Sequence, residues 1–297
     1  MKATIIGTGL TSMVGSRFVE LFQDEYYFTN LDLATGIDIT NEEDTKQKIE
    51  GGESGGVVLH FAAFTDVDAA NDQADDKDGL CYRLNVLGTR YVAQSCKAAG
   101  KYLIHISTDF VFDGTKTSPY TESDSPNPIE WYGQTKFWAE HEVEKSGVAG
   151  VIVRTTYPYR AHFEPKKDFV RNIIAKLKDG TLPPMFTDHI ITPTFIDDIA
   201  HALKVISEKK PQGIYHVVGS SYESNYDVAT KVAKIFGLDK SRIKPGSLEE
   251  FLKTAKRPYQ KSLATSNAKL KRDLGVSMST LEEGLYKMRE QQQENPR

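Results

Sequence analysis

The chain has 297 residues, enough for one large domain or two modest domains with a buried core. Its 37 basic and 41 acidic residues leave a net charge of −4, so charge gives no reason to expect nucleic acid or an anionic membrane as a partner. No run approaches the roughly 20 apolar residues of a membrane-spanning helix, and the chain opens on a strand pattern with no signal peptide, which favours a cytoplasmic protein.

The two cysteines predict neither a disulfide nor a metal site. Cys81 and Cys96 fall fifteen residues apart on one predicted helix, too far to bridge each other. No cluster of His and Cys surrounds them, so they are expected to be small thiols in a reducing compartment.

A strand, a glycine turn and a helix begin the chain. Residues 3–6 are apolar enough for a strand, and the turn that follows reads Gly9-x-x-Ser12-x-x-Gly15 before a helical pattern. In this context a glycine-rich turn predicts dinucleotide binding, because amides at a helix N-terminus can hold a pyrophosphate. A tight loop without a ligand is the alternative. The amides expected to hold the pyrophosphate are those of Ser12, Met13 and Val14.

The second predicted strand covers about residues 26–33 and ends near Asp32. A carboxylate there can accept both hydroxyls of an adenosine ribose and would repel a 2′-phosphate. No Arg or Lys lies between Leu33 and Ile37 to bind such a phosphate, so the sequence favours NAD(H) over NADP(H). An ordinary surface aspartate is the alternative at this position.

A helix is predicted after the polar run 71–79. Four apolar side chains recur at helical spacing and predict its buried stripe, with Asn85 just off it. These four residues are Leu80, Leu84, Leu87 and Tyr91.

The stretch from residue 101 to residue 145 holds the strongest chemical pattern. Residues 102–107 read as a buried strand, Thr108 and Asp109 follow at its end, and a later helix carries Tyr132 and Lys136. Four residues apart on a helix, the phenol and the ammonium share one face. A nearby cation lowers a tyrosine pKa from about 10, which makes Tyr132 a candidate proton donor and acceptor. A half-exposed aromatic beside a solvated lysine would give the same spacing.

The order of elements predicts an α/β fold. Strands and helices alternate from residue 1 to about residue 155, which indicates a doubly wound parallel sheet of Rossmann type with helices on both faces. Ligands of such sheets bind beyond the carboxyl ends of the strands, where the motifs lie. The predicted domains are a dinucleotide-binding domain, 1–155, to which about 190–220 returns, and a smaller, mostly helical substrate-binding part, 156–297.

Two segments carry a family resemblance: STDFVFDG, residues 107–114, and YGQTK, residues 132–136. They resemble the extended short-chain dehydrogenase/reductases, and most of all the dTDP-4-dehydrorhamnose reductases, over most of the chain. Between them the family's alternating pattern of Tyr, Glu, Asp and Pro is present as Tyr120, Glu122, Asp124, Pro126 and Pro128. The family uses either NAD(H) or NADP(H). One departure is Ser12, which stands where the extended family has a glycine.

The resemblance assigns roles to individual residues. It implies that Thr108 binds the substrate carbonyl, Tyr132 protonates the substrate oxygen, Lys136 holds the nicotinamide ribose, and Asn85 supports a proton path beneath the lysine. The implied cofactor-binding set is Gly9, Thr11, Ser12, Met13, Val14, Asp32, Asp38, Ile39, Phe61, Ala62, Ala63, Thr65, Asn85, Tyr132, Lys136 and Thr155. The implied substrate-binding set is Val67, Asp109, Phe110, Tyr157 and Arg257, with a surface ion pair as the alternative for Arg257.

The expected function is NAD(P)H-dependent reduction of a 4-keto-6-deoxy nucleotide-sugar, with that small molecule as partner and a homodimer left open. A 4,6-dehydratase needs a base after the acid that follows the threonine, and Phe110 cannot be one. A nucleotide-sugar 4-epimerase, which uses the same Thr, Tyr and Lys, stays open. A non-catalytic regulatory subunit of the same fold also stays open, because a serine in the glycine turn would suit a protein that has loosened its cofactor requirement.

Overall fold

The computed structural model describes residues 2–51 and 56–294. The chain forms two compact units, and each is built from segments that are distant in the sequence. The first unit contains Met1–Asp113, Ser125–Arg154 and Ala200–Tyr215, and the second contains Gly114–Asp124, Thr155–Ile199 and His216–Arg297. The division read from the sequence differs in two ways, since it kept 114–124 with the first domain and began the returning segment near residue 190.

A six-stranded sheet forms the centre of the first unit, in the order β10-β5-β4-β3-β1-β2. The pairs of β1 with β2, β1 with β3 and β3 with β4 are all parallel, which confirms the doubly wound α/β fold. Each residue of β3 is buried, as expected for a strand with helices on both faces. The strands are β1 (Ala3–Thr8), β2 (Tyr26–Asn30), β3 (Val57–His60), β4 (Tyr102–Thr108), β5 (Gly150–Thr155) and β10 (Gly213–His216).

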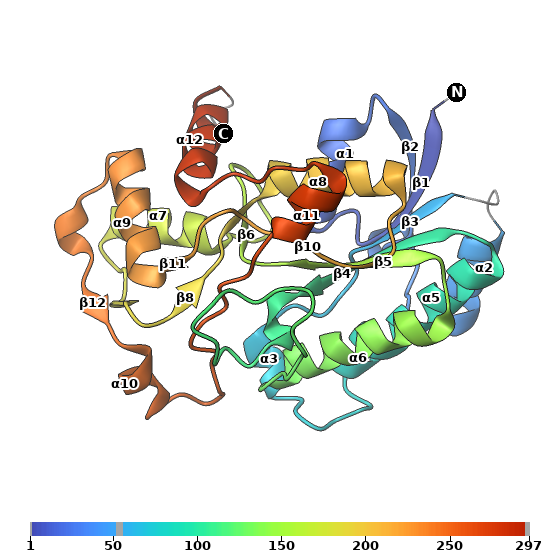
Figure 1. Cartoon of the computed structure of the whole chain (residues 1–297), viewed down its shortest axis with the longest axis horizontal. Helices are drawn as coiled ribbons and strands as arrows, with labels where there is room; N and C mark the ends of the chain where they lie inside the picture. Colours follow the sequence, from blue (N-terminus) through green and yellow to red (C-terminus); the bar gives the residue numbers. More distant parts are fainter. Residues whose placement is uncertain (1, 52–55, 295–297) are drawn as a thin grey trace. The chain divides into compact units, whose positions relative to one another are not determined.

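Helices cover both faces of this sheet (Figure 1). On one face α1 (Met13–Phe22) meets α8 (Ile196–Lys209) through the rings of Phe22 and His201, whose centroids are 5.4 Å apart. On the other face lie α2 (Glu42–Glu50), α5 (Thr89–Ala98) and α6 (Trp131–Ser146). These three helices share a buried cluster with the sheet, formed by residues such as Ile49, Val58, Val92, Leu103 and Val143.

The helical segment from residue 80 to residue 98 does not bury the predicted stripe. Leu80 is 52% exposed, whereas Cys81 and Asn85 are fully buried. The segment begins as α4 (Leu80–Tyr82), continues as a π-helix over Arg83–Gly88 and becomes α5. A π-helical turn contains an extra residue, so it rotates the positions that follow it away from a 3.6-residue repeat. The predicted leucine stripe was therefore wrong, and the π-helical turn places Asn85 in the interior.

The second unit is mostly helical around its own buried cluster, which includes Ile173, Leu177, Val232, Leu281 and Leu285. Its strands form three short two-stranded pairs. The strands are β6 (Pro158–Tyr159) with β9 (Thr194–Phe195), β8 (Ile190–Ile191) with β11 (Glu223–Ser224), and β7 (Met185–Phe186) with β12 (Pro245–Gly246). The helices are α7 (Phe169–Asp179), α9 (Asn225–Phe236), α10 (Leu248–Leu252), α11 (Ala268–Leu274) and α12 (Leu281–Glu294).

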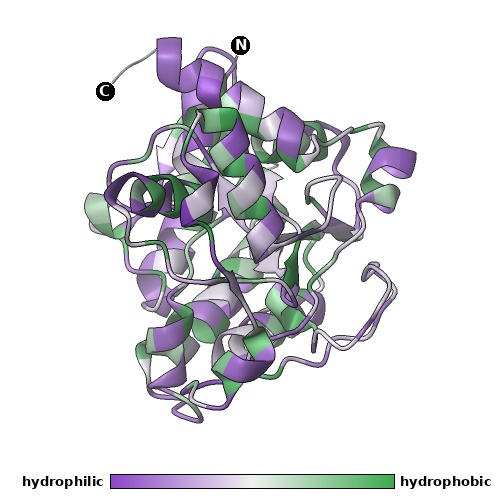
Figure 2. Ribbon diagram, turned by 90° about the vertical axis from the view of Figure 1, so that its left-hand side faces the viewer, coloured by the Kyte–Doolittle hydropathy of each residue, from purple (hydrophilic) through white to green (hydrophobic). Residues whose placement is uncertain are grey.

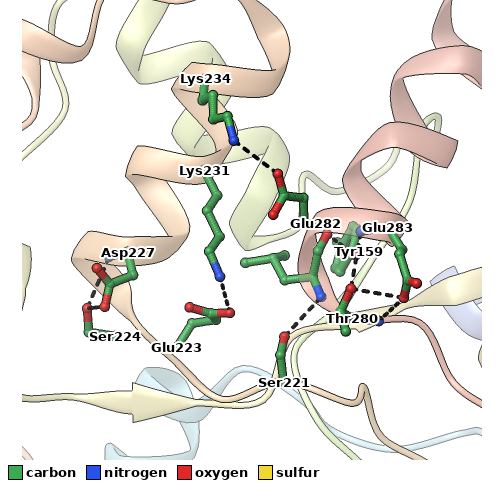
Figure 3. A network of polar contacts seen from close by, with 11 residues as sticks. Tyr159, Ser221, Glu223, Ser224, Asp227, Lys231, Lys234, Thr280, Glu282 and Glu283 are labelled. Atoms are coloured by element: carbon green, nitrogen blue, oxygen red, sulfur yellow. Dashed lines mark hydrogen bonds and ion pairs between the residues drawn. The ribbon is translucent and has the colours of Figure 1, made fainter.

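Polar contacts hold α12 to α9 and to the segment before β11 (Figure 3). The ammonium of Lys234 lies 3.1 Å from the carboxylate of Glu282, and the hydroxyl of Ser221 accepts the amide of Leu281 at 3.0 Å. The C-terminal turns of α12 are polar, as the purple ribbon near the label C in Figure 2 shows. Within the described ranges no helix is both long and apolar enough to cross a membrane.

A buried ion pair ties α6 to the sheet of the first unit. The guanidinium of Arg154 in β5 makes two hydrogen bonds to the carboxylate of Glu140 in α6, at 2.9 and 2.6 Å. The hydroxyl of Ser107 in β4 donates to the same carboxylate at 2.5 Å. Arg154 is 1% exposed and Glu140 is 2% exposed, so removal of either partner leaves the other charge buried and uncompensated.

We expect Glu140→Ala to lower the free energy of unfolding by about 3–5 kcal/mol, because the Arg154 charge would stay buried alone. Glu142→Ala is the matched control on the same helix: its partner Arg90 lies 2.7 Å away but is 36% exposed, and the expected loss is below about 1 kcal/mol. Urea unfolding at neutral pH measures both variants. Equal losses would contradict the role given to the buried pair.

Candidate functional site

The glycine turn lies where the winding of the sheet reverses. Strand β1 has β2 on one side and β3 on the other, so the carboxyl ends of β1 and β3 form the point at which such sheets bind ligands. Gly9 follows β1 with a φ of +73°, and a Cβ on it would come within 2.7 Å of the backbone nitrogen of Ala62. Only glycine fits there, which leaves a cradle of bare backbone between the two strand ends.

Ser12 is accommodated in this turn as the N-cap of α1. Its hydroxyl accepts the amide of Gly15 at 3.2 Å, while its own amide donates to the carbonyl of Gly9 at 3.0 Å. The Ser12 amide therefore closes the turn. Met13 and Val14 begin the helix, and the binding of a pyrophosphate by these three amides stays a prediction.

Asp32 is turned towards the glycine turn and is not at the surface. Its carboxylate accepts hydrogen bonds from the amides of Gly9, Leu10 (3.2 Å) and Thr11 (2.9 Å) and from the hydroxyl of Thr11 (2.7 Å). It is only 7% exposed, so the alternative of an ordinary surface aspartate was wrong. Strand β2 ends at Asn30, earlier than predicted, and the chain then turns so that Asp32 caps a short 3₁₀ helix.

The other predicted cofactor residues of this region follow β2 and β3 in the chain. A carboxylate oxygen of Asp38 accepts the amide of Thr40 at 2.9 Å, and the side chain of Ile39 is buried in the core. After β3, Ala62 and Ala63 are half-buried and Thr65 is exposed, so small side chains line the approach to the turn. Phe61 is buried beside them.

The catalytic candidates meet at the carboxyl end of β4. Thr108 is its last residue, and Tyr132 stands in the first turn of α6. A hydrogen bond links the Thr108 hydroxyl to the phenol, and the ring of Phe110 packs edge-on against that of Tyr132 at 5.6 Å between centroids. The structure thus places the predicted hydroxyl and phenol together.

A glycine lets these two segments approach so closely. A Cβ on Gly133 would lie 2.2 Å from the carbonyl oxygen of Phe110 and 2.6 Å from a carboxylate oxygen of Glu130. Residues 109–111 form a 3₁₀ turn that rests on the first turn of α6 at this point. The Gly in YGQTK is therefore needed for the contact between Thr108 and Tyr132.

Lys136 points to the same strand. Its ammonium donates to the carbonyl of Ile106 at 2.7 Å, and burial lowers its pKa to about 8. The pKa of Tyr132 is raised above its usual value, first by burial and then by the carboxyls of Glu130 and Asp109, while the hydrogen bond with Thr108 opposes the rise. The prediction that the lysine lowers the tyrosine pKa was therefore wrong, because burial outweighs the nearby charge.

Asn85 connects the π-helical turn to the loop after β3. Its side chain exchanges two hydrogen bonds with the backbone of Phe64, at 2.7 and 3.2 Å, and donates to the hydroxyl of Thr135 at 3.0 Å. Thr135 in turn bonds the carbonyl of Tyr132 at 2.8 Å. Asn85 thus supports the helix that carries the tyrosine, and the proton path beneath Lys136 stays a prediction.

Asp109 is a buried acid beside Thr108. It is 1% exposed, and the hydroxyl of Thr108 donates to one of its oxygens at 3.1 Å. The other oxygen finds no hydrogen-bond partner among the described residues. Burial raises its pKa to about 7, and the charge of Glu130 adds to the rise.

The remaining candidates fall in both units. Val67 begins α3 (Val67–Asn71) in the first unit, where it is half-buried and packs against the buried cluster that contains Trp131 and Tyr132. In the second unit Thr155 has a buried hydroxyl with no partner among the described residues, and Tyr157 has a φ of +35°, a strained value for an aromatic residue. The guanidinium of Arg257 stacks on the ring of Tyr259 at 3.7 Å.

One residue at the site was missed by the sequence reasoning. Glu130 caps α6, and its carboxylate accepts the amides of Tyr132 and Gly133 at 2.8 and 2.6 Å. Glutamate is not among the preferred N-cap residues, so its position just before the tyrosine gave no capping signal. No group of three or more His, Cys, Asp or Glu within residues 2–51 and 56–294 is arranged to hold a metal ion.

We expect Gly133→Ala to destabilise the protein by about 1–3 kcal/mol, because the new methyl group must push residues 109–111 away from α6. The displacement would also separate Thr108 from Tyr132. Thermal unfolding together with an activity assay measures both effects. Gly56→Ala is the control, since its Cβ would meet nothing closer than 3.7 Å, and a loss as large in that variant would contradict the argument.

Asp109 should make stability depend on pH. Its pKa is raised from 3.8 to about 7 in the folded protein, so between these values the unfolded chain releases a proton that the folded chain retains. Stability should therefore fall as pH rises through this window, by at most about 1.4 kcal/mol per pH unit, and level off above it. The free energy of unfolding of wild type minus that of Asp109→Asn, followed with pH, isolates this effect. A difference that does not change with pH would refute it.

The comparisons with known proteins agree with this geometry. A family model described as the RmlD substrate binding domain matches residues 1–294. The dTDP-4-dehydrorhamnose reductase of Mycolicibacterium smegmatis is 27% identical over 270 residues, which cover 90% of this chain and 80% of that protein. A probable low-salt glycan biosynthesis reductase of Haloferax volcanii, Agl14, is 28% identical over 251 residues, 84% of this chain and 81% of that protein.

The solved structures give the same result. A dTDP-4-dehydrorhamnose reductase from Bacillus anthracis, in complex with NADP, superposes with a TM-score of 0.89 at 29% identity and covers 98% of this chain and 100% of that one. A Clostridium acetobutylicum protein of the same name has a TM-score of 0.88 at 27% identity, covering 98% of this chain and 99% of that one. Because the family model spans almost the whole sequence, this chain belongs to the RmlD substrate binding domain family, within the extended short-chain dehydrogenase/reductases.

Proposed function

We propose that this protein reduces the 4-keto group of a 6-deoxy nucleotide-sugar with a nicotinamide cofactor. The observation that carries the proposal is the hydrogen-bonded contact of Thr108 with Tyr132 at the end of β4, in the same unit as the glycine turn. Relatives of this chain are named dTDP-4-dehydrorhamnose reductases, and one of them was solved with NADP.

The protonation state of Tyr132 suits the reductive direction. A ketone that accepts hydride becomes an alkoxide and needs an acid beside it, and a tyrosine whose pKa is raised keeps its proton at neutral pH. The reduced nicotinamide supplies the hydride when it is bound. Tyr132 then donates its proton to the substrate oxygen, while the hydroxyl of Thr108 orients that oxygen and stabilises the developing charge.

The chain's own residues suit a dinucleotide. The bare backbone at Gly9 leaves room that any Cβ would fill, and the amides of Met13 and Val14 stand at the N-terminus of α1. Lys136, whose pKa is lowered to about 8, would hold the nicotinamide ribose. A preference for NAD(H) is part of the proposal, since a 2′-phosphate would meet no Arg or Lys between Leu33 and Ile37.

The second unit is proposed to bind the nucleotide-sugar. Tyr157 holds a backbone conformation that costs energy, and such strain gathers at ligand-binding positions. The guanidinium of Arg257, which lies 3.7 Å from the centre of the Tyr259 ring, has the planar shape that binds diphosphate oxygens in pairs. A cytoplasmic location is also proposed, because Cys81 and Cys96 are both free thiols.

Two other activities make different demands. A 4-epimerase would return its hydride to the sugar and consume no reduced cofactor, so the stoichiometry of NAD(P)H oxidation separates it from a reductase. A non-catalytic subunit would have no use for a buried Thr, Tyr and Lys at one strand end. The serine that suited such a subunit caps α1 and keeps the turn intact, so it no longer favours that alternative.

We expect Tyr132→Phe to lower kcat by about 10²- to 10⁴-fold, because the phenol is the only proton donor assigned to the substrate oxygen. The assay follows the absorbance of NADH or NADPH over a panel of 4-keto nucleotide-sugars. Tyr27→Phe is the control, since that ring is 62% exposed. Turnover that ignores the Tyr132 substitution would remove this residue from the mechanism, and a lack of calorimetric binding by either cofactor would reject the enzyme.

A further inference from the structure

We propose that Asp32 is a positioning residue that holds the glycine turn in its cofactor-binding shape and does not itself bind the adenosine ribose. The inference rests on the proposed function, in which this turn binds a nicotinamide dinucleotide. It is carried by three features of the first unit: the place of Asp32 beside the turn, its hydrogen bonds and its burial.

The sheet brings Asp32 to the turn. Strands β1 and β2 pair in parallel with Gly7 opposite Asn30, and the amide of Leu31 donates to the carbonyl of Gly7 at 2.8 Å. The next residue therefore lies beside the turn that follows β1. The amide of Asp32 donates to the hydroxyl of Thr35 at 3.1 Å, and that hydroxyl donates to the carbonyl of Asn30 at 3.0 Å. The backbone that carries the carboxylate is thus held in place.

The carboxylate has no acceptor site left for a ribose. A carboxylate offers about four lone-pair sites, two on each oxygen. One oxygen of Asp32 accepts the amides of Gly9 and of Leu10 (3.2 Å), and the other accepts the amide (2.9 Å) and the hydroxyl (2.7 Å) of Thr11. Donors of the turn therefore fill all of these sites. A ribose would bring two further hydroxyls, and each would have to displace a bond that the turn already makes.

The turn depends on these bonds for its shape. Among the residues that the structure describes, the carboxylate of Asp32 is the acceptor that the amides of Gly9, Leu10 and Thr11 find. Asp32 is 7% exposed and Leu10 is 4% exposed, so water cannot readily take over as the acceptor. A buried amide without an acceptor costs about as much as a lost hydrogen bond, so the turn would change shape without the carboxylate.

The other side of the turn is held by the end of β3. The carbonyl of Thr8 accepts the amides of Phe61 and Ala62, at 2.9 and 3.2 Å. Asp32 completes this support from the side of β2, so the bare backbone at Gly9 is fixed before a ligand arrives. A site that is already ordered loses less conformational entropy when its ligand binds, which increases the affinity.

This role predicts an equal effect on the two cofactors. NADH and NADPH share the pyrophosphate and differ in the 2′-phosphate of the adenosine ribose. A residue that holds the turn acts on both alike, whereas a residue that binds the 2′-hydroxyl favours NADH and repels NADPH. The proposed preference for NAD(H) then depends on the absence of Arg and Lys between Leu33 and Ile37, and not on the carboxylate of Asp32.

Hydrogen exchange of the protein without cofactor tests the support of the turn. We expect Asp32→Ala to speed the exchange of the amides of Gly9, Leu10 and Thr11 by about 10- to 100-fold, followed by NMR, because each amide loses its bond to the carboxylate. Asp32→Asn keeps one acceptor oxygen and should give a smaller increase. Asp24→Ala is the matched control, since this aspartate of the same unit is exposed, and it should leave the three amides unchanged.

Calorimetric titration with NADH and with NADPH separates support of the turn from ribose binding. In Asp32→Asn both Kd values should rise by about tenfold, and their ratio should stay within about threefold of that of wild type. A residue that binds the ribose would instead weaken NADH and strengthen NADPH, so that the ratio changes by more than about tenfold.

The inference is overturned if the three amides exchange in Asp32→Ala as they do in wild type, or if Asp32→Asn weakens NADH alone. Should neither Asp32 variant keep the circular dichroism of wild type, Thr11→Val removes one donor and leaves the carboxylate in place. It should weaken both cofactors by the same factor, and a loss confined to NADH would contradict the inference. A wild type that binds neither cofactor would reject the proposed function, while the exchange of the amides still decides the role of Asp32.

Discussion

The contact between the end of β4 and the first turn of α6 is the constraint on which the site depends. Backbone meets backbone there, because Gly133 has no Cβ to keep the carbonyl of Phe110 away. The contact sets the distance between Thr108 and Tyr132 without help from any long side chain. Further along the same helix, the buried carboxylate of Glu140 in α6 bonds the hydroxyl of Ser107 in β4 and the guanidinium of Arg154 in β5. These bonds hold α6 to the sheet. A site built on two rigid elements holds its geometry better than one built on loops.

Burial then decides the chemistry of the groups gathered there. Taking a side chain out of water favours its neutral form, so the tyrosine and the aspartate keep their protons while the lysine gives its proton up more easily. The spacing of Tyr132 and Lys136 on one helix had instead predicted that the pKa of the tyrosine would be lowered. The attraction between two charged groups weakens with their distance, and it weakens further when each group is held by a hydrogen bond to a different partner. Desolvation, by contrast, acts on every buried group.

The sequence was sufficient for the parts of the structure that repeat a simple pattern. The alternation of strands and helices, the glycine turn at Gly9 and the position of Thr108 at a strand end all follow from periodicity and from the resemblance. It was insufficient where a local event changed the pattern, as at the π-helical turn that buries Asn85. It was also insufficient where a side chain could turn in two directions: Asp32 faces the amides of the glycine turn after β1, and nothing in the residues around Asp32 indicates this. Both are tertiary effects that no window of neighbouring residues contains.

The segment between β4 and α6 has a consequence for changes of chain length. The chain leaves the first unit after Asp113 and re-enters it at Ser125, and the residues between them belong to the second unit. Tyr120 in this segment is only 3% exposed, its amide donates to the carbonyl of Ala264 at 2.7 Å, and the carbonyl of Gly114 accepts the amide of Ser262 at 3.0 Å. The entropy of closing a loop grows only with the logarithm of its length, so a free loop would tolerate inserted residues. Here an insertion would break buried contacts, and the length of this segment is therefore constrained by packing and not by chain entropy.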